Sequence, residues 1–333
     1  MTDLVAIARS LFAPGKGLLA ADESVATADK RLASYSIASG EEMRKKDREL
    51  FLNAPGVEEY LSGVILFSET FAQKGSDRKL FSNSLADRGV LPGIKVDEGT
   101  EPFPESPHEL ITKGLIGLPE RLAEFAKKRA VFTKWRAVIK IEGDTLPTAQ
   151  AILENAKRLA TYAREAQEAG LVPILEPEVV LEGKHSRTRA ADVLKEVLTT
   201  LFAQVDEQHV DRASIVLKTA MALSGSENTK KDTPEEVALN TVEALIASVP
   251  KQIAGIVFLS GGQTPDQATE NLAAVCRRTK AVSAPWPVTF SFARALQEEA
   301  LAVWRGEEVN LLAARAAFLS RLQKLSKAVY PDG

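Results

Sequence analysis

The sequence alternates short apolar segments with amphipathic helical segments, and it does so eight times along 333 residues. The apolar segments are rich in Val, Ile and Leu, which is typical of strands buried on both faces of a parallel sheet. We predict strands over residues 17–21, 63–67, 91–97, 134–140, 171–178, 214–220, 255–259 and 287–291. No linker interrupts the pattern, so residues 1–333 are predicted to form a single domain.

Polar residues lie at the downstream ends of many different predicted strands. They are Asp22, Glu69, Lys95, Asp97, Lys134, Glu176, Lys218, Ser260 and Ser291. An open, doubly wound sheet is the alternative architecture, but it concentrates its ligand-binding groups at one switch point. A closed barrel collects such groups from all its strands onto one face. The sequence therefore predicts an α/β fold, a single (β/α)8 TIM barrel with extra N-terminal and C-terminal helices.

Charged residues share a face on several of these strands because strand side chains alternate. Lys134, Arg136 and Lys140 are predicted to point to one side, and Glu176 and Glu178 to share a side of the next strand. Three cations on one face are costly inside a core. We expect this face to open onto water, counter-charges or an anionic ligand.

Lys218 interrupts the apolar run of residues 214–220. Burial and a nearby Lys134 would both favour the uncharged amine, which is the nucleophilic form of lysine. With carboxylates in reach, such an amine can form a Schiff base with a carbonyl substrate. The alternative is a lysine at a strand end that reaches solvent or pairs with a carboxylate.

Glycines and cations at other strand ends indicate phosphate binding. Ser260-Gly261-Gly262 follows the seventh strand and Arg294 follows the eighth, where barrels commonly hold phosphate on free backbone N–H groups. Lys30 and Arg31 follow the first strand and would serve a second phosphate on the opposite rim. Their alternative interpretation is two exposed helix cations.

Composition excludes several classes of partner. The chain is 45% hydrophobic with a net charge of −3, so nucleic acid is not the expected ligand. No apolar run approaches the ~20 residues that span a bilayer, and the opening residues lack a signal-peptide pattern, so we expect a soluble, cytoplasmic protein with no membrane partner. The single cysteine, Cys276, excludes an intramolecular disulfide. His108, His185 and His209 are scattered without ligand spacing, so we expect no metal site.

These residues carry a resemblance to a known family across roughly residues 5 to 330. The motifs are GKGLLAADES (15–24), KRL (30–32), GIKVD (93–97), KWR (134–136), VPILEPE (172–178), LK (217–218), FLSGGQ (258–263) and TFS (289–291). In this order the motifs resemble class I fructose-1,6-bisphosphate aldolase. The resemblance implies a Schiff-base lyase that reversibly cleaves fructose 1,6-bisphosphate to dihydroxyacetone phosphate and glyceraldehyde 3-phosphate, in glycolysis and gluconeogenesis, without a metal or other cofactor. It also implies a homotetramer.

The resemblance further implies a role for each matching position. Lys218 is similar to the Schiff-base lysine, Glu176 to the acid and base that handles the carbinolamine hydroxyl, and Asp22 to the carboxylate that takes the C4-hydroxyl proton. Lys134 and Glu178 are similar to residues that balance charge around the imine. The implied substrate-binding residues are Thr27, Arg31, Lys95, Arg136, Ser260, Gly261, Gly262, Ser291, Ala293 and Arg294. Among them, Ser260, Gly261 and Arg294 would contact the C1-phosphate, and Thr27, Arg31 and Lys95 the C6-phosphate and the hydroxyl chain.

The sequence departs from the animal members of that family at several positions. Thr219-Ala220 replaces Pro-Asn after Lys218, Ala293 replaces a glycine, and Thr27 replaces a serine. The sequence ends at Gly333 without the tyrosine-ended tail that animal members use to exchange the proton at C3. Tyr330, another group or water would have to take that step, or turnover of the enamine would be slow.

Two other functions fit the same residues. One is a Schiff-base aldolase for a different phosphorylated ketose. The other is a catalytically weak scaffold that binds sugar phosphates. The filled acid, base and nucleophile positions favour an enzyme, and the paired cationic sites favour a bisphosphate substrate.

Overall fold

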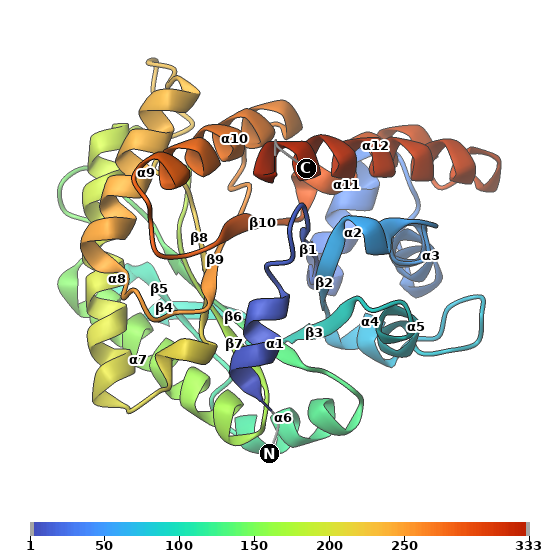
Figure 1. Cartoon of the computed structure of the whole chain (residues 1–333), viewed down its shortest axis with the longest axis horizontal. Coiled ribbons are helices and arrows are strands. Elements are labelled where there is room, and N and C mark those ends of the chain that lie inside the picture. The colour runs from blue at the N-terminus through green and yellow to red at the C-terminus, as the bar shows by residue number, and fades with distance from the viewer. Residues whose placement is uncertain (1–2, 331–333) are drawn as a thin grey trace.

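The eight predicted strands lie side by side and parallel in a closed barrel in the computed structural model, which describes residues 3–330 (Figure 1). The order around the barrel is β1-β10-β9-β8-β7-β6-β3-β2. These strands are β1 (Gly17–Ala21), β2 (Leu61–Leu66), β3 (Leu91–Lys95), β6 (Phe132–Ile139), β7 (Val172–Val179), β8 (Val216–Thr219), β9 (Gly255–Phe258) and β10 (Val288–Phe292). Closure confirms the TIM-barrel prediction and rules out the open sheet.

Helices form the outer layer around these strands (Figure 1). The α-helices are α1 (Leu4–Ser10), α2 (Val25–Ser34), α3 (Glu41–Leu52), α4 (Ser68–Ala72), α5 (Phe81–Asp87), α6 (Leu118–Lys127), α7 (Ala149–Glu168), α8 (Arg187–Glu207), α9 (Pro234–Ser248), α10 (Pro265–Ala281), α11 (Arg294–Trp304) and α12 (Leu311–Val329). Short 3-10 turns are η1 (Val57–Glu59), η2 (Arg212–Ser214) and η3 (Glu308–Asn310). Within residues 3–330 no helix combines the length and the apolar character needed to cross a bilayer.

A two-stranded hairpin lies between β3 and β6 along the chain and forms a sheet separate from the barrel. Its strands are β4 (Thr100–Phe103) and β5 (Ser106–Thr112), and they pair antiparallel outside the barrel. The prolines fit because a two-stranded ribbon has free edges where a missing N–H costs nothing. Glu109 ties the hairpin to the start of α7 by accepting hydrogen bonds from Thr148 N (2.8 Å) and Oγ1 (2.6 Å).

Two apolar layers separate because strand side chains alternate. In β1, Leu18 and Ala20 belong to the cluster inside the barrel, whereas Leu19 and Ala21 pack among the residues between strands and helices. Helix α1 closes the amino end of the barrel with Ala8, and Leu11 just after the helix packs beside it. Apolar residues therefore fill the amino half of the interior, which leaves the carboxyl half for polar groups.

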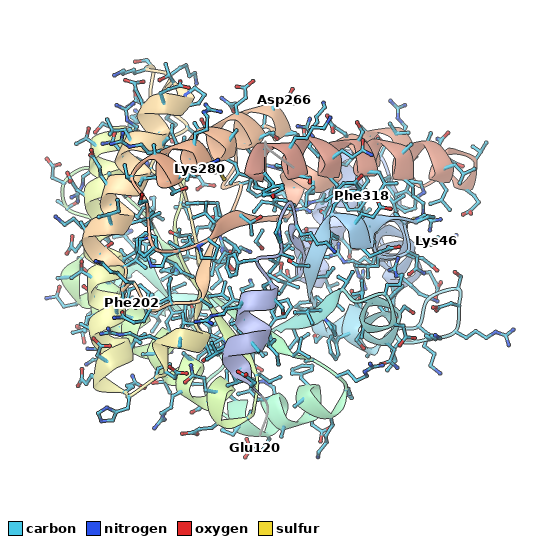
Figure 2. All side chains as sticks on the ribbon, in the orientation of Figure 1. Lys46, Glu120, Phe202, Asp266, Lys280 and Phe318 are labelled. Carbon is cyan, nitrogen blue, oxygen red and sulfur yellow. The ribbon has the colours of Figure 1, made fainter. Side chains whose placement is uncertain are left out.

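The last helix is fastened to the two helices before it by one buried arginine. Arg321 of α12 is 1% exposed and donates hydrogen bonds to Asp266 (2.8 Å) in the first turn of α10 and to Glu299 (2.9 Å) on α11. Almost one turn earlier on α12, Phe318 (labelled in Figure 2) meets Phe51 of α3 edge to face, with ring centroids 4.9 Å apart. Helix α12 thus joins helices from both ends of the chain.

Candidate active site

Four ionisable side chains, one following β1 and one each on β6, β7 and β8, form a continuous buried chain inside the barrel mouth, the barrel-centre cluster: Asp22, Lys134, Glu176 and Lys218. Lys134 Nζ lies 2.6 Å from Asp22 Oδ2 and 3.0 Å from Glu176 Oε2. Lys218 Nζ lies 2.9 Å from Glu176 Oε1. Each residue is less than 9% exposed, so these charges are compensated by one another rather than by water.

The alternation of strand side chains explains this convergence. On β6, Lys134 and Arg136 face the interior, whereas Trp135 faces outward and stacks on Tyr162 of α7 with ring centroids 5.4 Å apart. On β7, Glu176 and Glu178 both face the cavity, as the sequence predicted. Each of the two interpretations of Lys218 from the sequence holds in part. The side chain is buried at the barrel mouth, and it also pairs with a carboxylate, that of Glu176.

The two lysines set the ionisation of both carboxylates. Burial alone would raise the pKa of Asp22, but the ammonium groups of Lys134 and Lys218 outweigh it and hold that pKa well below its usual range. The pKa of Glu176 is lowered in the same way, because Lys134 and Lys218 together outweigh the effect of burial. Burial would lower the pKa of Lys134, yet Asp22 and Glu176 raise it overall. Both carboxylates are therefore anions at neutral pH and able to accept protons.

One oxygen of the cluster is available for a ligand. Glu176 Oε2 lies near Lys134 without hydrogen-bond geometry, and it has no hydrogen-bond partner within residues 3–330. The same is true of Ser291 Oγ, which is 1% exposed. Buried polar atoms are normally satisfied, so these two atoms indicate where a bound molecule would make hydrogen bonds.

The residues to which the resemblance assigned catalytic or substrate-binding roles line a single cavity of about 480 Å³ above the cluster. They are Asp22, Thr27, Arg31, Lys95, Lys134, Arg136, Glu176, Glu178, Lys218, Ser260, Gly261, Gly262, Ser291, Ala293 and Arg294. This volume suits a small metabolite. Cations and free backbone groups lie on its wall, so an anionic ligand is favoured.

The turn after β9 requires its glycines. Gly261 and Gly262 have φ values of +49° and +85°, in the left-handed region that side chains rarely adopt. A Cβ added at Gly262 would also lie 3.6 Å from Arg294 Nη2, so the turn and this arginine approach closely. Backbone N–H groups beside a guanidinium form a suitable cradle for phosphate.

The opposite wall carries two ion pairs. Lys95 pairs with Asp97, and Asp97 also accepts a hydrogen bond from the backbone N–H of Arg136 at 3.2 Å. Arg136 Nε donates to Glu178, and this contact holds the pKa of Arg136 above its usual value despite burial. These pairs fix the direction of both cations at the cavity wall.

A second buried charge cluster adjoins the first and was missed from the sequence. We call it the Glu23 relay: Glu23, Arg31, Asp47 and Arg48. Glu23 forms ion pairs with both Arg31 and Arg48, the latter at 2.8 Å, and Asp47 pairs with Arg48 at 3.0 Å. Glu23 follows directly after Asp22, but no local pattern indicated that α3 would bring Arg48 to it.

Several polar residues that the sequence associated with the site lie elsewhere. Lys140 follows the end of β6 and pairs with Glu142 in solvent, so two cations, not three, face the cavity from that strand. Lys30 is an exposed helix cation, and Glu69 pairs with Arg44 outside the barrel. Tyr330 lies in a separate cavity with Lys16 and Trp286, near the amino ends of β1 and β10.

Comparisons with known proteins agree with this geometry. A family model described as glycolytic fructose-bisphosphate aldolase class-I matches residues 3–331. The cytoplasmic isozyme of fructose-bisphosphate aldolase from Spinacia oleracea is 45% identical over 327 residues, which cover 98% of this chain and 90% of the spinach protein. Human fructose-bisphosphate aldolase B is 43% identical over 322 residues, covering 96% of this chain and 87% of the human protein.

Solved structures give the same result. The fructose-bisphosphate aldolase of Plasmodium falciparum, in a ternary crystal structure with TRAP and a small-molecule inhibitor, superposes with a TM-score of 0.95. It is 39% identical and covers 98% of this chain and 94% of the Plasmodium chain.

Proposed function

This chain belongs to the class I fructose-bisphosphate aldolase family, and on that premise we propose how its residues cleave the sugar. The family is that of carbon-carbon lyases that act through a Schiff base rather than a metal. The reaction is the reversible cleavage of fructose 1,6-bisphosphate into dihydroxyacetone phosphate and glyceraldehyde 3-phosphate. Residues 1–333 would act as a single catalytic domain.

Lys218 is the nucleophile in this proposal. The Lys218 ammonium first gives a proton to Glu176, and the free amine attacks the C2 carbonyl; the carbonyl oxygen then takes a second nitrogen proton and the proton held by Glu176 and leaves as water, so an iminium that keeps one N–H is formed. Glu176, 2.9 Å from Lys218 Nζ, carries these protons, and its Oε2 is free to receive a hydrogen bond from the carbinolamine hydroxyl. Lys134 keeps the site electrically balanced while Lys218 is consumed. Glu178 supports the balance by pairing with Arg136.

Asp22 is the base for carbon-carbon cleavage. Its carboxylate takes the proton of the C4 hydroxyl, the oxygen forms the new aldehyde, and the C3–C4 electron pair moves into the iminium to give an enamine. Glyceraldehyde 3-phosphate leaves first. Protonation of the enamine at C3 and hydrolysis then release dihydroxyacetone phosphate and restore Lys218. Because Tyr330 lies near the amino end of the barrel, we assign the C3 proton to water or to another group of the cavity.

Two phosphates orient the substrate across the cavity. Ser260, Gly261, Gly262, Ser291, Ala293 and Arg294 would bind the C1-phosphate through backbone N–H groups, hydroxyls and the guanidinium. Thr27, Arg31, Lys95 and Arg136 would bind the C6-phosphate and the hydroxyl chain. Two anion sites on opposite walls favour a bisphosphate over other phosphorylated ketoses.

The observation that carries this proposal is the position of Glu176 between Lys218 and Lys134 in a continuous, buried chain of charges. Treating the protein with borohydride and dihydroxyacetone phosphate should reduce the imine and leave one covalent adduct on Lys218, found by peptide mass mapping. The Lys218→Arg variant and a reaction without the sugar phosphate are the controls. An unchanged intact mass in the wild-type protein would overturn the proposal.

Location and assembly follow the family. Relatives such as the spinach isozyme are named cytoplasmic, and we propose that this protein is cytoplasmic as well. We also propose a homotetramer, as the family resemblance implies. Sugar phosphates are its expected small-molecule partners.

A further inference from the structure

We propose that Arg48 is a positioning residue for substrate phosphate: it holds Glu23, and through Glu23 it sets the position and availability of Arg31 at the cavity wall. This inference rests on the proposed function only in taking Arg31 as a contact of the C6-phosphate. Arg48 itself does not line the cavity. It acts through its neighbours.

The contacts form a single line from α3 to the cavity. Arg48 is 3% exposed, and its Nη2 lies 2.8 Å from Glu23 Oε2. The other oxygen of Glu23 pairs with Arg31 Nη1, and both Glu23 and Arg31 line the cavity. One carboxylate therefore joins a buried guanidinium to one that meets the ligand.

Arg31 has a second support besides Glu23, and the same nitrogen, Nη1, makes both contacts. Its guanidinium donates to Gln297 Oε1, and the amide of Gln297 donates to the carbonyl of Ala20 on β1 at 3.3 Å. Gln297 is 1% exposed, so this support is rigid. Arg31 is thus held between Gln297 and Glu23, and loss of one support would allow it to turn out of line with the phosphate.

Arg48 has a second effect when phosphate binds. A phosphate that takes Arg31 competes with Glu23, and a buried carboxylate that loses its partner is strongly destabilised. Because Arg48 stays paired with Glu23, the carboxylate keeps a counter-charge whether or not the phosphate is bound. Arg48 therefore lowers the cost of transferring Arg31 from Glu23 to the ligand.

Asp47 completes the support of Arg48. Asp47 does not line the cavity, but its Oδ2 accepts a hydrogen bond from Arg48 Nη1 at 3.0 Å. Lys46, the residue before it, is exposed at the outside of the molecule (Figure 2). Helix α3 thus turns a charged pair inward at positions 47 and 48, whereas Glu41, Glu42 and Lys46 on the same helix are exposed.

The test compares two substrates that differ only in the second phosphate. In the Arg48→Met variant we expect KM for fructose 1,6-bisphosphate to rise about tenfold, which corresponds to 1.4 kcal/mol. KM for fructose 1-phosphate, which lacks the group that Arg31 would contact, should rise less than about threefold. Equal rises for both substrates, or no rise for either, would overturn the proposal.

Arg44→Met is the matched control. Arg44 lies one turn earlier on α3, is 9% exposed, and also pairs with two carboxylates, Asp29 at 2.9 Å and Glu69 at 2.6 Å. It does not contact Glu23, so its loss should lower the melting temperature without changing the ratio of the two KM values. A changed ratio in Arg44→Met would show that any loss of charge on α3 produces the effect, and would contradict the role of Arg48.

Two further variants keep the test decisive. If Arg48→Met fails to fold, Arg48→Lys retains the buried charge but loses the fork of the guanidinium, and its KM ratio should still rise about threefold.

In the Arg31→Met background, Arg48→Met should add less than about twofold to KM for the bisphosphate, because it acts through Arg31. Full additivity would contradict the proposal. Absence of an adduct on wild-type Lys218 would instead contradict the proposed function, so the two failures are distinguishable.

Discussion

Two buried charge clusters meet at the end of β1, where Asp22 belongs to the barrel-centre cluster and Glu23 to the Glu23 relay. Each contains two carboxylates and two cations. The barrel-centre cluster uses lysines on strands, and the relay uses arginines on helices. Lysine can lose its proton within reach of physiological conditions, whereas arginine stays charged and binds through a fixed fork. The chain therefore places arginine in the relay, where both charges must stay, whereas the barrel-centre cluster combines Lys134, whose pKa is raised, with Lys218, the proposed nucleophile.

The two clusters also shift the pKa values of their carboxylates in opposite directions, as Asp22 and Asp47 show. Lys134 and Lys218 lower the pKa of Asp22 in spite of its burial. Burial raises the pKa of Asp47 to about 6, because the cations Arg48 and Arg31 do not outweigh it and the nearby Glu23 adds to it. Asp47 Oδ1 has no hydrogen-bond partner within residues 3–330. In the barrel-centre cluster the two lysines thus outweigh the effect of burial on both carboxylates, whereas in the relay burial prevails at Asp47.

The largest effect should come from removing the proton carrier of the barrel-centre cluster. We expect Glu176→Gln to lower kcat by about 10²–10⁴, the usual contribution of general acid-base catalysis. Substrate affinity should change much less, because an amide occupies the same space. Rapid-quench trapping of the imine and equilibrium binding of the bisphosphate measure the two effects separately.

Glu178→Gln, two residues along the same strand, is the comparison for that variant. It should slow imine formation less, because Glu178 pairs with Arg136 and has no ion pair with Lys218. Equal losses of binding and of imine formation in Glu176→Gln would contradict its role as a proton carrier.

A smaller effect, on stability, should distinguish the relay. The folded-state pKa of Asp47, about 6, is above the usual aspartate value of 3.8, so the folded protein favours the protonated form. Its stabilising effect is complete below about pH 4 and is lost as the pH rises through 6, because the buried carboxylate must then carry a charge. Asp47→Asn should therefore gain stability relative to wild type between pH 4 and 7, on the order of 2 kcal/mol.

Urea unfolding of both proteins at pH 4.5 and 7.5 measures this difference. Arg44→Met should show no matching dependence on pH over that range. A gain for Asp47→Asn that is the same at both pH values would mean that Asp47 does not titrate between them, and the contrast between the clusters would lose its electrostatic basis.

The smallest effect should come from Lys140, which the sequence placed beside the cluster but which lies outside the cavity. Lys140 pairs with Glu142 at 2.7 Å and both side chains are exposed, so Lys140→Ala should change kcat/KM less than about twofold and stability by less than about 0.5 kcal/mol. Steady-state kinetics and thermal unfolding check both values. A loss above tenfold would restore the sequence interpretation of three cations facing the ligand.

Much of the fold and the placement of the site were accessible from sequence because barrel topology converts strand ends into a common face. Residues 17–21 are a strand as predicted, and residues 134, 176 and 218 meet because alternation and closure leave them no other direction. The end of β6 could not be predicted in the same way. The strand stops at Ile139, so Lys140 does not share the face of Lys134 and Arg136 that its spacing suggested.

Pairing between distant segments could not be read from local patterns. Glu23 and Arg48 are 25 residues apart, and their contact depends on how α3 packs against α2 and the barrel. The hairpin of β4 and β5 was hidden because its prolines resemble those of a loop, and its register is set by only a few pairs. The roles of the site residues stay predictions until the experiments above are done.

Arg321 has a practical consequence for work on fragments of this chain. It fastens α12 to α10 and α11, and these helices begin just after the strand ends that carry Gly262 and Arg294. A truncation between residues 304 and 321 would retain every strand yet loosen both helices at their contact with the last one. Weaker sugar-phosphate binding by such a fragment would therefore not show that the deleted segment touches the sugar.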